Sequence, residues 1–295
     1  MAIPIGRRLR PYLFWLAVGL VLFFFAFPLY WMVITSFKPR AEATSETPTF
    51  IPWVQFDPTL QNYEEVLIEV KTTAYGGQET VQESEFPEML KNSILISGSA
   101  TLAAVILGTM AAYAFSRFSV PGENDLLFFI LSTRMLPPVV VVIPIFLMFI
   151  ELDWLNTFVG LFVLYTVVGL PFVVWIMKGF FDEIPPEYEE AAMIDGHSRL
   201  TAVFKIVIPE AIPGMLATAV FVLILAWNEY LFALRLNPRE FSTAPIFLSE
   251  VIGFGRTEWG RMAATSVILV SPIIVFTFLV RNHLLRGVTF GAVRR

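Results

Sequence analysis

The sequence of 295 residues has no cysteine and only two histidines. These absences exclude disulfides, thiolate metal sites and cysteine nucleophiles, and they leave too few ligands for a histidine-rich metal site. The chain also has no Gly-Lys dipeptide, so it lacks a phosphate-binding loop of the P-loop kind. Charged residues make up 15% of the chain, compared with about 25% in soluble domains. A soluble enzyme, a nucleic-acid-binding protein and a disordered scaffold are therefore poor fits.

Hydrophobic residues, by contrast, make up 56% of the chain, and the mean hydropathy is +0.70. A helix needs about 20 apolar residues to cross the hydrocarbon core of a bilayer. Five stretches of at least 18 residues contain no Asp, Glu, Lys or Arg: 11–37, 92–116, 154–177, 211–228 and 262–280. A sixth, Leu126–Ile150, is interrupted only by Arg134. None alternates polar and apolar residues as the strands of a membrane barrel do, so the sequence predicts an all-α integral membrane protein with six transmembrane helices.

Basic residues at the two ends of the chain set the expected orientation. Three arginines precede the first span, and four lie at or beyond residue 281. Because the cytoplasmic flanks of spans carry an excess of Lys and Arg, we expect both termini to be cytoplasmic. The segment 41–88 is then external, and it holds ten acidic residues and one lysine. The loops between the termini follow the charge rule less clearly. A cleaved signal peptide is not expected, because the first apolar run is too long.

The chain is expected to divide into four parts. Residues 1–37 form the cytoplasmic N-terminus and the first span, residues 38–90 the external acidic loop, residues 91–281 a core of five spans, and residues 282–295 a cytoplasmic tail. Within the external loop, 59–70 has the pattern of an amphipathic helix, whereas 71–86 is polar and is expected to be a flexible insertion.

The segment 180–210, between the fourth and fifth spans, has the composition of two short helices joined by a turn. Two prolines favour the start of the first helix, and the glutamates that follow suit a helix N-terminus. Gly196 can provide the left-handed residue that ends this helix. Ser198 can cap a second helix that runs to about Val207, and Pro209 is expected to end it.

The spacing in this segment resembles the cytoplasmic EAA loop of bacterial ABC importer permeases. The residues that carry the resemblance are Glu190, Ala191, Ala192, Gly196, Ile206, Ile208 and Pro209. Only Ile208 departs from the pattern, since leucine is commoner there. The wider chain is similar to the carbohydrate type of these permeases, in particular to the smaller maltose permease subunits. The supporting segments are Arg134–Pro138, Pro144–Phe146, Leu155–Thr157, Leu170–Phe172, Ala226–Leu234 and Arg286–Val293.

The resemblance implies an ABC importer type I-like permease fold in the bacterial inner membrane. It implies that the chain forms half of the translocation pathway for a sugar, polyol or similar hydroxylated solute. The implied partners are a second, related permease subunit, two ATPase subunits, an external solute-binding protein and membrane lipid, with no nucleic acid. No cofactor or metal is expected on this chain, because ATP and Mg would be bound by the partner ATPase.

The resemblance also implies which residues act. Those expected to couple to the ATPase are Glu190, Ala191, Ala192, Asp195, Gly196, Ile206 and Pro209. Glu190 has an alternative role as a helix cap, and Asp195 an alternative role as a turn residue. A contact between the tail and the ATPase is implied for Gly287, Thr289, Phe290 and Gly291. The alternative for the tail is a disordered basic end.

Two groups within the spans are candidates for the solute pathway. Arg134 is an ionisable residue inside a span, where such residues usually face a cavity or a partner. A structural ion pair or hydrogen bonds to carbonyls are the alternative. The second group combines the polar and aromatic side chains that sugars require, but it also has the composition of a helix end in the interfacial aromatic belt. It consists of Trp227, Asn228, Glu229 and Tyr230.

Two other functions remain open at this stage. An importer for a solute that is not a sugar would share the same loop. A membrane-embedded enzyme would need convergent acids, histidines or metal ligands, whereas the acids of this sequence cluster in the EAA loop and the external loop.

Overall fold

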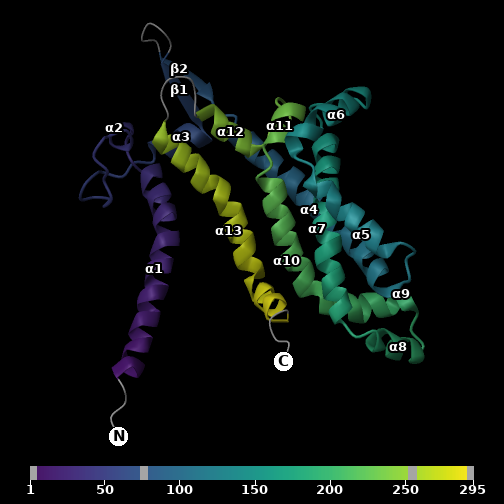
Figure 1. Ribbon diagram of the computed structural model, residues 1–295. Helices are drawn as coiled ribbons and strands as arrows, with labels where there is room; N and C mark the ends of the chain where they lie inside the picture. Colours follow the sequence, from purple (N-terminus) through teal and green to yellow (C-terminus); the bar gives the residue numbers. More distant parts are fainter. Residues whose placement is uncertain (1–4, 74–78, 252–257, 291–295) are drawn as a thin grey trace. The chain divides into compact units, whose positions relative to one another are not determined.

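The computed structural model describes the backbone of residues 5–73, 79–251 and 258–290, and the side chains of 12–68, 81–251 and 258–281. The chain is almost entirely helical (Figure 1). The contacts divide it into two compact units. Met1–Phe86 and Leu248–Val270 form the first unit, and Pro87–Phe247 and Ser271–Arg295 form the second.

The first unit begins with helix α1 (Ile5–Ser36), whose apolar side chains from Tyr12 onward are mostly exposed. It also holds the short helices α2 (Arg40–Ala43) and α3 (Gln61–Leu67) and part of α12 (Ala244–Val251). The chain after α1 is fixed by buried polar contacts. Asn62 Nδ2 donates to the carbonyls of Ser36 at 2.9 Å and Lys38 at 2.8 Å. Lys38 Nζ donates to the Thr49 carbonyl at 2.6 Å, and burial lowers the pKa of this lysine although Glu42 partly opposes the shift.

Two expectations for the external loop were wrong. The helix over 59–70 is shorter, because α3 ends at Leu67. The expected flexible insertion contains an antiparallel hairpin of strands β1 (Glu69–Thr73) and β2 (Glu79–Glu83), with Glu69 opposite Glu83 and Thr73 opposite Glu79. Threonine and valine are β-branched residues that favour such strands, but the polar composition of the segment concealed them.

The second unit is built around three long helices. Helix α4 (Phe86–Arg117), α7 (Phe158–Glu183) and α10 (Ile208–Trp227) pack through a common core that includes Ala104, Val173, Met177, Ala211 and Val222. Helix α11 (Leu231–Leu236) follows α10, and α13 (Trp259–Phe290) starts in the first unit and continues into this one.

Glycines allow the long helices of this core to approach closely. A Cβ atom on Gly108 of α4 would lie 2.5 Å from Cβ of Val173 on α7, and one on Gly169 would lie 2.8 Å from Val222. Real Cβ atoms do not approach to these distances, so larger residues there would force the helices apart. Gly108 therefore lets α4 pack closely against α7.

The helices support the predicted transmembrane architecture, with one difference. Five are long and apolar enough to cross a membrane: Tyr12–Ser36, Phe86–Arg117, Phe158–Glu183, Arg199–Trp227 and Trp259–Arg281. The sixth predicted span is broken. Helix α5 (Glu123–Ser132) and the 3₁₀ turn η1 (Thr133–Met135) are followed by α6 (Pro138–Glu151) after a bend of 95°.

The break follows from two consecutive prolines. A residue before proline is disfavoured in the helical region, and both Leu136 and Pro137 precede a proline. Leu136 has φ −71° and ψ 122°, and Pro137 has φ −61° and ψ 132°, so both are extended. Pro138 then begins α6, where its missing N–H needs no partner.

Candidate functional site

The EAA loop folds as two helices around a tight turn. Helix α8 (Glu187–Ile194) is capped by Asp195 and followed by Gly196, which has φ +90°. The N–H of His197 donates to the Ala192 carbonyl at 3.1 Å, a bond that this left-handed turn makes possible. Ser198 Oγ accepts from the Thr201 N–H at 3.3 Å and caps α9 (Arg199–Ala202). The predicted turn and cap are confirmed.

The end of the second short helix was predicted incorrectly. Pro209 does not stop it, because α9 continues through a π-helical turn η2 (Val203–Val207) into α10. The Ile208 N–H reaches back five residues to the Val203 carbonyl. This wider turn lies directly before Pro209, which sits in the first turn of α10 where its missing N–H is tolerated. The loop is therefore continuous with a membrane-spanning helix.

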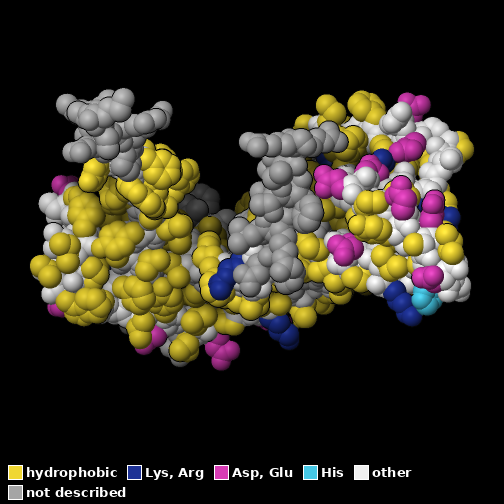
Figure 2. All heavy atoms as spheres, turned by 90° about the horizontal axis from the view of Figure 1, so that it is seen from below, with side chains coloured by type: hydrophobic (Ala, Val, Ile, Leu, Met, Phe, Trp, Pro, Cys, Tyr) yellow, Lys and Arg dark blue, Asp and Glu magenta, His cyan; other side chains and the backbone are white. Residues whose placement is uncertain are grey.

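The side chains of the loop divide between a buried and an exposed set. Ala192 is buried, whereas Glu190, Ala191, Asp195 and Gly196 are exposed. Ile206 is half-buried and Pro209 is exposed. Sequence reasoning missed three large apolar side chains that are also exposed here: Ile194, Leu200 and Phe204. Charged side chains gather over the end of the second unit that holds α8 and α9 (Figure 2). An exposed apolar cluster among charges is typical of a docking surface.

A buried ion pair anchors this loop, and sequence reasoning missed it. Glu189 accepts from Arg117 Nε at 2.5 Å and from the Tyr113 hydroxyl at 2.6 Å. Both charged side chains are almost fully buried, with 7% of Arg117 and 4% of Glu189 exposed. Arg117 also donates to the carbonyls of Phe181 at 3.0 Å and Ile184 at 2.8 Å. One arginine at the end of α4 therefore joins the start of α8 to the end of α7.

A second, more exposed network lies beside this anchor. Lys178 Nζ lies 2.8 Å from Asp182 and 3.3 Å from Glu123. The Ser116 hydroxyl donates to Asp182 at 2.7 Å. These contacts tie α4, α5 and α7 together at the same end, although exposed pairs of this kind contribute only about 0–1 kcal/mol each.

The residues proposed to line the pathway lie where α10 gives way to α11. Glu229 accepts from the N–H groups of Phe232 at 2.9 Å and Ala233 at 3.0 Å, and from the hydroxyl of buried Tyr165 at 3.0 Å. The carboxylate therefore caps α11 and joins it to α7. Trp227 is buried, whereas Asn228 and Tyr230 are exposed. An acid just before a short apolar run was the signal for this cap.

The other pathway candidate, Arg134, lies in η1 beside the 95° break. Its guanidinium carbon lies 4.9 Å from the centre of the Phe172 ring on α7. Its Nε atom is buried and has no hydrogen-bond partner among the described residues. The arginine is thus held by an aromatic face.

The candidate tail residues are described only in part. Helix α13 continues to Phe290, so the backbone of Gly287, Thr289 and Phe290 is helical where a separate tail was expected from 282. The side chains of 282–290 and the whole of Gly291 lie outside the described residues.

Comparisons with known proteins agree with the predicted transmembrane permease. Residues 104–289 match the family described as the binding-protein-dependent transport system inner membrane component. The trehalose/maltose transport system permease protein of Thermococcus litoralis is 34% identical over 91% of both chains. The diacetylchitobiose uptake system permease protein of Streptomyces coelicolor is 29% identical and covers 95% of this chain and 94% of its own length.

The fold is also similar to a solved structure. A chain of a bacterial ABC transporter that imports the acidic polysaccharide alginate superposes with a TM-score of 0.74 and 20% identity, over 96% of this chain and 99% of that one. The family model matches most of the chain, and the apolar helices and the EAA loop agree with it. These observations together establish the protein family. The chain belongs to the binding-protein-dependent transport system inner membrane components, the multi-pass permease subunits of ABC importers.

Proposed function

We propose that this chain forms half of the translocation pathway for a sugar, polyol or similar hydroxylated solute. The relatives named for trehalose, maltose and diacetylchitobiose support this substrate class. The observation that carries the proposal is the EAA loop, which is exposed at its tip and anchored at its base by Arg117 and Glu189.

The loop is proposed to dock a separate ATPase subunit. In this arrangement Glu190 meets a basic group, while Ile194, Leu200 and Phe204 fill an apolar cleft. ATP and Mg are bound by two copies of the ATPase, and a second, related permease completes the pathway. An external solute-binding protein delivers the solute. A non-sugar solute would use the same coupling loop and is distinguished by the uptake assay below.

The experiment is co-purification followed by transport. We expect the chain to purify with an ATPase and to support ATP-dependent uptake of a neutral disaccharide in proteoliposomes that contain the external binding protein. Glu190→Lys should lower ATPase recovery at least fivefold. Glu187→Lys is the matched control, since it makes the same charge change on an exposed residue of α8. A chain that purifies alone, or uptake of an amino acid with no uptake of sugars, would contradict the proposal.

Both termini and the EAA loop are proposed to be cytoplasmic. The chain has no cysteine, so single cysteines report orientation without background. We expect Val54→Cys to react with a membrane-impermeant maleimide added to intact cells, and His197→Cys to react only after permeabilisation. Both positions are exposed. The opposite labelling pattern would overturn the orientation.

A further inference from the structure

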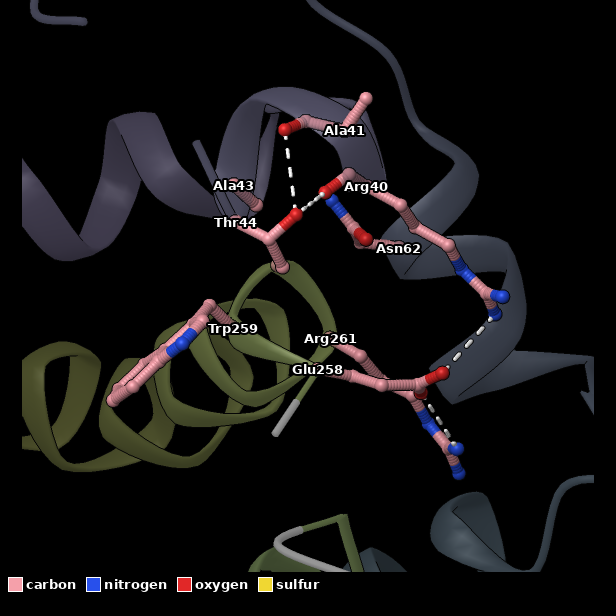
Figure 3. Close-up of a pocket in the computed structure, with 9 residues that line it drawn as sticks. Arg40, Ala41, Ala43, Thr44, Asn62, Glu258, Trp259 and Arg261 are labelled. Carbon is pink, nitrogen blue, oxygen red and sulfur yellow. Dashed lines mark hydrogen bonds and ion pairs between the residues drawn. The ribbon is translucent and has the colours of Figure 1, made fainter. Parts of the chain in front are cut away.

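A polar pocket of about 350 Å³ lies in the first unit. Residues of the acidic loop and of the start of α13 line it: Arg40, Ala41, Ala43 and Thr44 around α2, Asn62 on α3, and Glu258, Trp259, Gly260 and Arg261 at the start of α13. Figure 3 shows the indole of Trp259 at one end of the pocket and the guanidinium groups of Arg40 and Arg261 at the other. A cavity of this size is within the usual range for small-molecule sites.

The charges of this pocket are already paired. Arg40 lies 2.8 Å from Glu65 and 3.5 Å from Glu258, and Arg261 lies 3.4 Å from Glu258. Because each of these arginines already lies beside a carboxylate, the described lining does not favour a charged ligand. Arg40 and Glu258 remain partly exposed, so they can donate to and accept from hydroxyl groups. This favours a neutral, hydroxylated ligand.

Trp259 supplies the apolar part of the site. It is 49% exposed, and it lines the pocket together with the small residues Ala41 and Ala43. An indole offers a large rigid face with little loss of conformational entropy. A pyranose ring presents C–H groups on its faces and hydroxyls around its edge, which matches an aromatic face opposite paired charges.

The wall between these two ends is rigid. Asn62 is fixed by its bonds to the Ser36 and Lys38 carbonyls. A Cβ atom on Gly260 would lie 2.6 Å from Asn62 Oδ1, so the backbone of α13 is packed directly on this amide. Such a wall is organised before a ligand arrives, which lowers the entropic cost of binding.

We propose that this pocket is a binding site for one ring of a neutral sugar, on the external side of the permease. The proposal rests on the sugar-importer function above and adds a site on this subunit for the solute. Trp259 stacks on the ring, while Arg40 and Glu258 bind its hydroxyls.

The test is saturation-transfer NMR with maltose as the probe, on the assembled transporter in lipid nanodiscs without the binding protein. We expect transfer from aromatic protons to the ring C–H protons of maltose in the wild type. Trp259→Ala should reduce it at least fivefold, and Ala41→Phe, which fills the pocket from its exposed side, should do the same. Trp259→Phe should keep half or more. Trp53→Ala is the matched control, because Trp53 is 81% exposed in the same unit and does not line the pocket.

Two results would overturn the site. One is equal transfer in the wild type, Trp259→Ala and Ala41→Phe. The other is a fivefold loss of binding-protein-stimulated ATP hydrolysis in Trp259→Ala with no sugar present, since the pocket would then hold the binding protein. ATP-driven maltose uptake by the wild type, measured on the same samples, separates the two proposals. Uptake without transfer refutes this site alone, whereas uptake of a non-sugar solute in its place refutes the sugar-importer function.

Discussion

Arg117→Ala is expected to abolish ATP-driven transport while the chain still inserts into the membrane. The substitution leaves the Glu189 carboxylate buried with the Tyr113 hydroxyl as its one remaining side-chain donor among the described residues, and it removes donors from the carbonyls of Phe181 and Ile184. Removing one partner of a buried ion pair costs about 3–5 kcal/mol, which is about a hundredfold or more in an equilibrium. Helix α8 should therefore leave its place on α4 and α7.

Uptake in proteoliposomes and hydrogen exchange of residues 185–198 measure this effect together. We expect at least tenfold slower uptake and faster exchange in Arg117→Ala. Lys91→Ala is the control, because Lys91 is an exposed basic residue of the same helix α4 and lies outside the EAA loop. It should change uptake less than twofold. Normal uptake by well-inserted Arg117→Ala would show that the anchor has no part in coupling.

Gly196→Val is expected to lower transport at least tenfold. Gly196 has φ +90°, a conformation that β-branched residues adopt only with strain of about 1–3 kcal/mol. A Cβ atom at this position meets nothing within 4 Å, so the strain comes from the backbone and not from a collision. The turn should relax to negative φ, and the bond from the His197 N–H to the Ala192 carbonyl should be lost.

Gly196→Asn separates the backbone effect from the added side chain. Asparagine also fills the open space but tolerates the left-handed region, so this variant should keep most of the uptake. ATPase co-purification should fall in Gly196→Val and not in Gly196→Asn. Equal uptake by the two variants would mean that the turn does not depend on the glycine.

Local signals in the sequence predicted the local features of the site well. Gly196 and Ser198 act through their own backbone and their nearest neighbours, so their roles were visible in the spacing. The two prolines after Leu136 also act locally, because they set the extended backbone of Leu136 and Pro137 at the break.

Long-range contacts could not be predicted in this way. Arg117 and Glu189 are separated by 72 residues, and each alone has the composition of an ordinary span end or helix start. Glu229 was predicted as a pathway residue because periodicity does not show that α11 begins directly after it and that Tyr165 lies against it. The hairpin of β1 and β2 was missed because its pairing carries no apolar pattern.

The way helix α4 is held has a mechanical consequence. The helix packs on α7 at Gly108, and its last residue, Arg117, binds α8. It extends from Phe86 to Arg117, and it packs tightly against α7 at Gly108. At about 1.5 Å per residue, the arm from Gly108 to Arg117 is about 14 Å long and the arm to Phe86 about 33 Å. If α4 rocks about Gly108 as a stiff rod, a displacement of about 1 Å at Arg117 becomes roughly 2.4 Å at the far end. The glycine contact then works as a fulcrum, and the unequal arms amplify small movements of the EAA loop into larger ones across the membrane.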